Sequence, residues 1–155
     1  MDPCEHAVVL FDRGFNCAES VLSALCSASG CEIEHLRRLA TPFGSGISRR
    51  GTVCGCLSGA AMAIGLVAGR SEPSDVDGKD RAYGMVERLM ELFGRQFDSI
   101  ECRTLTGLDF HDPGAVERFR ADARDRVCVP AIRFTVERAL EELRGAGVAP
   151  RNQVE

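Results

Sequence analysis

Apolar residues recur at intervals of three and four along most of the chain, which is the spacing of one face of an α-helix. The segment from Lys79 to Phe97 follows this pattern, with polar residues on its other face. The segment from Val53 to Ala68 is apolar almost throughout, which predicts a helix at the centre of the fold. No segment alternates strictly enough to predict a β-strand. We therefore expect an all-α fold, a compact single-domain bundle of about six or seven helices around a buried central helix at about 53–68.

Local signals predict where several helices begin and end. Asp2, followed by a proline, is a favourable start for the first helix. Asn16 with Glu19 three residues later predicts a capping box at the start of the second helix. We expect Ser99 to cap a short helix. Pro130 predicts a break or kink before the last helix, because a proline disfavours helical backbone in the residue before it.

Length and charge exclude several classes of protein. The 155 residues suit one domain, which we expect over 1–147, followed by a flexible tail over 148–155. The net charge is -4 and no Lys/Arg cluster stands out, so we expect no nucleic-acid partner. The longest apolar run is shorter than the ~20 residues of a membrane span, so we expect no membrane insertion. The N-terminus has no export signal pattern, so we expect a cytoplasmic protein.

The eight cysteines are the most informative part of the composition. Without an export signal, such a content favours metal binding or thiol chemistry over disulfides. Four of them fall at or beside predicted helix starts, where free backbone N–H groups and the helix dipole lower the pKa of a thiol. These four are Cys17, Cys54, Cys102 and Cys128. We expect folding to gather their sulfurs in one electropositive pocket, where they remain ionised.

The other four cysteines have positions typical of buried structural residues. They are Cys4, Cys26, Cys31 and Cys56. Cys26 lies nine residues after Cys17, and therefore on the opposite face of the same predicted helix. Cys56 would point about 200° away from Cys54 if both were helical. It could join the site only if the backbone around Cys54 were not yet helical.

No cysteine spacing matches a zinc ribbon, a ferredoxin or a c-type haem motif, because the chain has no Cys-x-x-Cys. A metal site would therefore have to be assembled by tertiary folding from distant cysteines. The three histidines, His6, His35 and His111, are isolated beside charged residues, and we expect them to be solvated or to cap helices.

A glycine-rich stretch covers residues 43–51 and is too rich in glycine for a helix interior. It lacks the lysine of a phosphate-binding P-loop, so Gly44 and Gly46 predict a tight turn. Such a turn brings the backbone close to a neighbouring helix or to a bound cofactor. Gly55 and Gly59, four residues apart on the predicted central helix, would also allow another backbone to approach closely.

Five short segments together form a recognisable pattern. They are Asn16-Cys17-Ala18-Glu19-Ser20-Val21, Phe43-Gly44-Ser45-Gly46-Ile47, Cys54-Gly55-Cys56-Leu57-Ser58-Gly59, Cys102-Arg103-Thr104-Leu105-Thr106-Gly107 and Cys128. In this order and spacing they resemble the C_GCAxxG_C_C family, which is named for redox activity. The resemblance extends from about residue 7 to residue 143.

The resemblance implies a small helical protein that is also similar to part of the split-Soret cytochromes, which are dimeric electron-transfer proteins. It implies four family cysteines, Cys17, Cys54, Cys102 and Cys128, that bind an iron–sulfur cluster. The chain departs from the family pattern at Cys56, where alanine is usual. This departure implies an additional ligand or a resolving thiol.

Three functions remain open at this point. In the first, the four family cysteines hold an iron–sulfur cluster for electron transfer, and N–H groups of the glycine loop hydrogen-bond its sulfurs. In the second, Cys54 attacks a disulfide, and Cys56 or another thiol resolves the mixed disulfide. The third is a structural zinc site in a helical interaction module. We also expect an unidentified redox partner protein and a homodimer, which is the commonest soluble assembly.

Overall fold

A computed structural model describes residues 1–31 and 33–147. Within these ranges the protein is all-α, and the only β pairing is one isolated antiparallel bridge between Val53 and Glu101. This confirms the predicted fold class. In the described part of the chain, no helix is both long enough and apolar enough to cross a membrane. The predicted tail, 148–155, lies outside the described residues.

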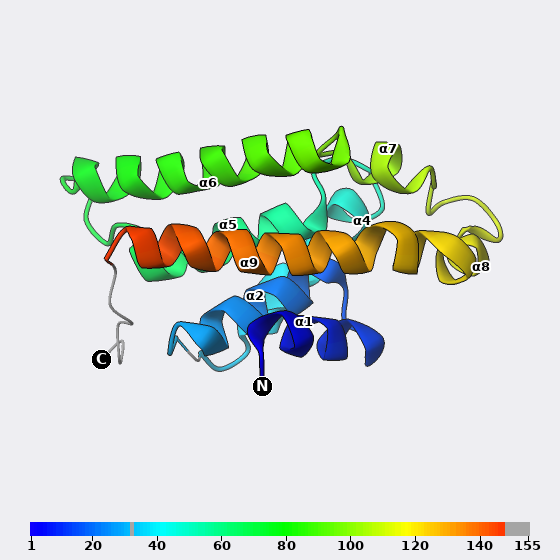
Figure 1. Ribbon diagram of the computed structural model, residues 1–155, viewed down its shortest axis with the longest axis horizontal. Helices are drawn as coiled ribbons and strands as arrows, with labels where there is room; N and C mark the ends of the chain where they lie inside the picture. Colours follow the sequence, from blue (N-terminus) through cyan, green and yellow to red (C-terminus); the bar gives the residue numbers. More distant parts are fainter. Residues whose placement is uncertain (32, 148–155) are drawn as a thin grey trace.

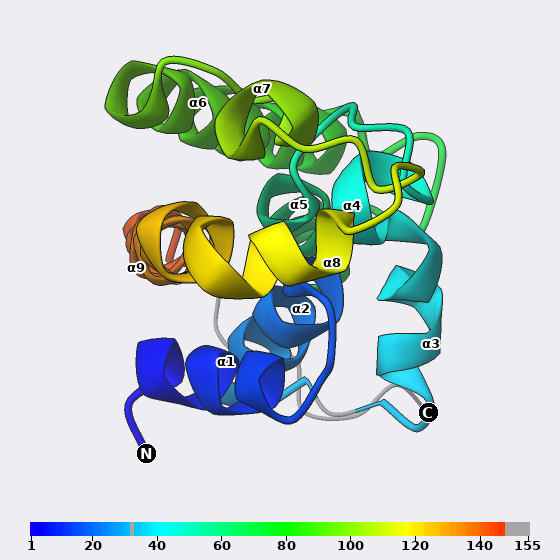
Figure 2. The same ribbon diagram turned by 90° about the vertical axis from the view of Figure 1, so that its right-hand side faces the viewer.

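The elements follow one another in this order: α1 (Pro3–Asp12), α2 (Cys17–Ala28), α3 (Leu36–Ala40), the 3-10 helix η1 (Thr41–Phe43), α4 (Gly44–Ile47), α5 (Gly55–Ala68), α6 (Val76–Phe97), α7 (Cys102–Thr106), α8 (Ala115–Arg118), the π-helix η2 (Phe119–Cys128) and α9 (Val129–Gly145). Figures 1 and 2 show them in three layers. Helix α6 forms one outer layer, α5 and α9 form the middle layer, and α1 and α2 form the other outer layer.

Helix α5 lies at the centre of the bundle and packs against α2, α6 and α9, as its apolar sequence predicts. Its residues Ala60, Ala63 and Ile64 have no exposed surface. The approach of α2 to α5 depends on glycine, because a Cβ on Gly59 would lie 2.5 Å from the carbonyl oxygen of Ala18.

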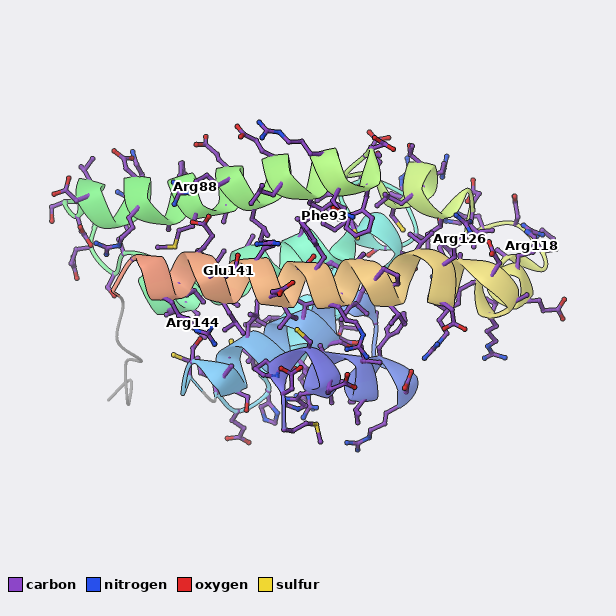
Figure 3. The ribbon with its side chains drawn as sticks, in the orientation of Figure 1. Arg88, Phe93, Arg118, Arg126, Glu141 and Arg144 are labelled. Atoms are coloured by element: carbon purple, nitrogen blue, oxygen red, sulfur yellow. The ribbon has the colours of Figure 1, made fainter. Side chains whose placement is uncertain are left out.

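The interface between α6 and α9 is formed largely by aromatic packing. Phe93 has no exposed surface and points from α6 toward α9 (Figure 3). Its ring centroid lies 4.7 Å from that of Phe97 and 6.2 Å from that of Phe134. Burial of these rings contributes much of the hydrophobic stabilisation that holds the two long helices together.

The local signals for the first two helices are confirmed. The Asp2 carboxylate accepts a 3.0 Å hydrogen bond from the backbone N–H of Glu5, which caps α1. Asn16 and Glu19 form a reciprocal capping box, with hydrogen bonds of 3.0 and 2.8 Å. The prediction for Ser99 is wrong, because α7 is preceded by Glu101 at its cap position. The Ser99 hydroxyl instead accepts a 3.0 Å hydrogen bond from the backbone N–H of Glu101.

Of the break or kink predicted before Pro130, the break is absent, because the helical backbone runs without interruption from α8 through η2 into α9 (Figure 2). The winding does change there, since the π-helix η2 ends at Cys128 and the α-helix α9 begins at Val129. The N–H of Val129 donates to the carbonyl of Arg124, five residues earlier, which is the spacing of a π-helix. This wider turn relieves the clash that a proline ring causes in a regular α-helix. Cys128 has helical backbone angles and therefore does not lie at a free helix start.

Candidate functional site

The first residue of α2 is Cys17, and its position is fixed from two sides. The Asn16 side chain caps α2 and also donates a 3.1 Å hydrogen bond to the carbonyl of Thr41. The Thr41 hydroxyl in turn donates to the carboxylate of Glu19 over 2.6 Å. These contacts join the first turn of α2 to the segment that leads into the glycine-rich stretch.

A short antiparallel pairing places the segment before α5 beside the segment that begins α7. The N–H of Cys54 donates to the carbonyl of Ile100 over 2.8 Å, and the N–H of Cys102 donates to the carbonyl of Thr52 over 2.7 Å. The two cysteines are thereby held on paired segments, although they are far apart in sequence. This pairing leaves no signal in the sequence, because one bridge is too short to produce a visible alternation of polar and apolar residues.

The sulfur of Cys17 and those of four other cysteines are brought together at one site. The thiols of Cys54 and Cys56 donate hydrogen bonds to the Cys17 sulfur. Cys102 and Cys128 line the same cavity as Cys17, and we call it the cysteine cavity. The site thus contains all four predicted cysteines and one more.

Cys56, which the sequence pattern indicates is a buried structural residue, is buried and also donates a hydrogen bond to Cys17. Cys54 has non-helical backbone, with a ψ of 132°, and helix α5 begins only at Gly55. The extended backbone at Cys54 removes the 200° separation that two helical residues would have. Both thiols can therefore contact Cys17, which is the condition under which Cys56 was expected to join the site.

The predicted glycines allow the backbone to approach the site closely. A Cβ on Gly55 would lie 2.5 Å from the Cys17 sulfur, and a Cβ on Gly44 would lie 2.7 Å from the Asn16 side-chain nitrogen. Gly46 has a φ of +65°, and a Cβ there would lie 2.8 Å from the Cys102 Cβ. The close neighbours of these glycines thus include Cys17 and Cys102, which carry two of the sulfurs, and Asn16, which holds Cys17.

Within the cluster, Cys17 is the thiol whose pKa is lowered. Hydrogen bonds from Cys54 and Cys56 outweigh the effect of burial and lower its pKa well below the ordinary value of 9.0. The backbone N–H groups of Ala18 and Cys17 itself lower the pKa further, as a helix N-terminus should.

The expectation that all four family cysteines are ionised is wrong for the other three. Cys54 donates a hydrogen bond to Cys17, and this hydrogen bond raises the pKa of Cys54 well above 9.0. Burial and then the negative charge of Cys17 raise the pKa of Cys102 to about 11. The same two causes raise the pKa of Cys128, and nearby Arg124 only partly opposes them. The pKa of Cys17 is thus lowered while those of its neighbours are raised, because adjacent thiolates would repel one another.

The remaining cysteines lie outside this cluster. The thiol of Cys4 donates to the carbonyl of Arg133 over 3.6 Å. Burial first, and then the charge of neighbouring Cys31, raises the pKa of Cys26 to about 12. Cys26 and Cys31 line a different cavity, which shares Phe15 with the cysteine cavity.

The donor set is suited to a cofactor that binds several sulfurs. Among residues 1–31 and 33–147, no three His, Cys, Asp or Glu side chains are arranged around a single metal ion. A cluster with several irons takes its cysteine ligands at separate atoms, so its ligands need not converge on one point. The five neighbouring sulfurs fit such a cluster by their chemistry.

Comparison with known proteins gives one match. The family described as "Putative redox-active protein (C_GCAxxG_C_C)" matches residues 15–142, which is more than half of the chain. The matched region includes all five clustered cysteines. Neither a curated protein nor a solved structure matches the chain.

Proposed function

Because the chain belongs to the C_GCAxxG_C_C family of redox-active proteins, we propose that it transfers electrons through an iron–sulfur cluster held by Cys17, Cys54, Cys102 and Cys128. The observation that carries this proposal is the gathering of these four sulfurs, with Cys56, at one buried site. Such a cluster supplies one-electron transfer when it is bound.

The chain's own residues have distinct roles in this proposal. Cys17 has the lowered pKa and so loses its proton most readily, which makes it the first ligand, because thiolates rather than thiols bind metals. The other three thiols must lose their protons on binding, so cluster affinity should rise with pH. The Arg124 guanidinium favours the ionised form of Cys128.

The test is to purify the protein without oxygen, supply ferrous iron and sulfide, and measure visible absorption, iron and acid-labile sulfide. We expect stoichiometric iron and sulfide in the native chain. Serine at any of Cys17, Cys54, Cys102 or Cys128 should lower the iron content, whereas Cys31→Ser should not. Cys56→Ala restores the residue usual in the family pattern and should retain the cluster. A colourless protein with stoichiometric zinc would instead support the structural zinc site.

A second candidate function, thiol–disulfide exchange, is favoured by the lowered pKa of Cys17. The Cys17 thiolate would attack one sulfur of a substrate disulfide, forming a mixed disulfide and releasing one substrate thiolate. Cys54 or Cys56 would lose its proton to solvent and attack the Cys17 sulfur, which releases the second thiolate. Two electrons pass to the substrate, and the chain keeps one internal disulfide. This assignment replaces Cys54 by Cys17 as the attacking thiol, because the pKa of Cys54 is raised.

Thiol titration before and after mild oxidation of the metal-free protein separates this function from the first. Exchange activity requires the reversible loss of two thiols, with the new disulfide mapped by mass spectrometry to Cys17 and either Cys54 or Cys56. Cys17→Ser should abolish this loss and Cys31→Ser should not. A disulfide that excludes Cys17 would contradict the exchange mechanism.

A further inference from the structure

The cysteine cavity extends well beyond the sulfurs. Its volume is about 650 Å³, within the ~300–1,000 Å³ range of small-molecule sites. Only three of its sixteen lining residues are cysteines. Most of the wall therefore cannot ligate iron and is free to recognise something else.

One part of the wall is aromatic. Phe11 from α1, Phe119 from η2 and Phe110 from the loop between α7 and α8 are all half-buried, so each ring leaves some surface accessible. The Phe119 ring packs edge-on against Phe11 at 6.1 Å between centroids and against Phe110 at 5.9 Å. Ring packing of this kind gives a rigid apolar surface that suits a flat or apolar ligand.

The charged part of the wall is mainly positive. Arg49, Arg120 and Arg124 line the cavity, and the groups that can oppose them with negative charge are Asp12 and the Cys17 thiol, whose pKa is lowered. Asp12 is already paired with Arg124. In the described part of the chain, Arg49 and Arg120 have no carboxylate partner, so two guanidinium groups are available to an anion.

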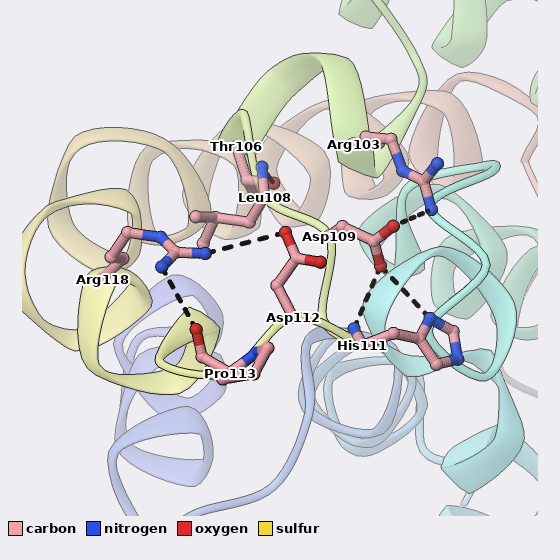
Figure 4. A network of polar contacts seen from close by, with 8 residues as sticks. All are labelled: Arg103, Thr106, Leu108, Asp109, His111, Asp112, Pro113 and Arg118. Carbon is pink, nitrogen blue, oxygen red and sulfur yellow. Dashed lines mark hydrogen bonds and ion pairs between the residues drawn. The ribbon is translucent and has the colours of Figure 1, made fainter.

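The loop that carries Phe110 is held in place without a ligand. Asp109 forms an ion pair with Arg103 at 3.1 Å and accepts a 3.0 Å hydrogen bond from the backbone N–H of His111 (Figure 4). Arg118 lies 3.9 Å from the carboxylate of Asp112 in the same network. The aromatic wall is thus pre-organised, which lowers the entropic cost of binding.

We propose that the cysteine cavity binds a small aromatic anion, whose ring packs on Phe11, Phe110 and Phe119 and whose charge is held by Arg49 and Arg120. Cys17, Cys102 and Cys128 line the same cavity, so the bound anion would lie next to sulfur. Binding requires neither a metal nor a redox step. The proposal therefore stands apart from the proposed function.

The test uses two fluorescent probes on the reduced, metal-free protein. 8-Anilinonaphthalene-1-sulfonate is an aromatic anion, and N-phenyl-1-naphthylamine is its neutral counterpart without the sulfonate. We expect the anion to bind more tightly than the neutral probe. Arg120→Gln should weaken binding of the anion about fivefold and leave the neutral probe unchanged. Arg144→Gln is the matched control, because Arg144 is exposed and lies at the far end of α9 from Arg118 and Arg126 (Figure 3).

Alkylation of the cysteines identifies where the probe binds. The anionic probe should slow alkylation of Cys17, Cys102 and Cys128, read from peptide masses, and should leave Cys4 unprotected. Equal affinity for the two probes, no effect of Arg120→Gln, or no protection of the cavity cysteines would each overturn the proposal. The probe experiment uses the metal-free protein, so its outcome does not depend on whether an iron–sulfur cluster can be reconstituted.

Discussion

A Cβ atom on Gly55 would lie 2.5 Å from the sulfur of Cys17, closer than real non-bonded contacts allow. The absence of a side chain at the first residue of α5 therefore lets the thiolate at the first residue of α2 occupy its position. The same sulfur accepts hydrogen bonds from the thiols on either side of Gly55, those of Cys54 and Cys56. Cys54 and Cys56 thus each donate a hydrogen bond to the Cys17 sulfur, and Gly55 between them presents no side chain that would displace it.

Replacing Gly55 by alanine should disrupt the cluster. The added methyl group must displace the Cys17 sulfur or separate α2 from α5, and overpacking of this kind costs roughly 1–3 kcal/mol. Gly65→Ala is the control, because a Cβ added at Gly65, in the same helix, would meet no neighbouring atom within 4 Å. That change should stabilise the protein by about 0.5–1 kcal/mol. Denaturant unfolding measures both effects, and equal stability of the two variants would contradict the close contact.

The pKa of Cys17 should depend on Cys56. Because its folded pKa lies well below 9.0, Cys17 should stay reactive toward iodoacetamide as pH falls below 9.0, and should lose reactivity only at the lowered pKa. Cys56→Ala removes one hydrogen-bond donor to the Cys17 sulfur, so Cys17 should begin to lose reactivity at a higher pH than in the native chain. Peptide mass spectrometry of alkylated samples over a pH series measures this shift. Cys31→Ala should leave the profile unchanged, and a native profile that already falls near pH 9.0 would refute the assignment.

Two helix caps provide a matched pair of substitutions. Asp2→Ala and Asn16→Ala each remove a capping side chain and should each cost about 1 kcal/mol of folding free energy. Only Asn16 precedes Cys17, so only Asn16→Ala should loosen the first turn that supplies the N–H of Ala18 to the sulfur. Its expected signature is a rise in the pKa of Cys17 in the same alkylation assay. An identical pH profile in both variants would mean that the cap does not hold the site.

The predictable parts of this fold are those that local chemistry determines. The caps at Asp2 and Asn16 follow from a side chain and an N–H group three residues apart. The central position of α5 follows from its apolar sequence, which no exposed helix could carry. Four of the five clustered cysteines were identified because helix starts favour thiolates, although only Cys17 has a lowered pKa.

The parts that sequence patterns did not predict depend on single backbone angles or on distant partners. Cys56 reaches Cys17 only because Cys54 has extended backbone, and no local pattern determines that angle. The pairing of Cys54 with Ile100 joins segments that are far apart in sequence through one isolated bridge. The helix continues past Pro130 because η2 is wound as a π-helix, whereas the propensity of proline alone indicates a break.

A buried hydroxyl in α9 offers a last test of the packing around the core. In the described part of the chain, Oγ1 of Thr135 has no hydrogen-bond partner, although the residue has no exposed surface. A buried polar group without a partner is costly, so Thr135→Val, which keeps the shape, should stabilise the protein by about 1 kcal/mol.

The matched substitution is Thr106→Val at the end of α7. The Thr106 hydroxyl donates to the carbonyl of Cys102 over 2.7 Å and accepts from the N–H of Leu108 over 3.2 Å. Its removal takes the hydroxyl acceptor away from the buried N–H of Leu108, so this change should destabilise the protein by about 1–3 kcal/mol. Urea unfolding under reducing conditions compares the two variants directly. If Thr135→Val lowered the free energy of unfolding more than Thr106→Val, the Thr135 hydroxyl would have to bind a partner, and the core around α9 would be packed differently.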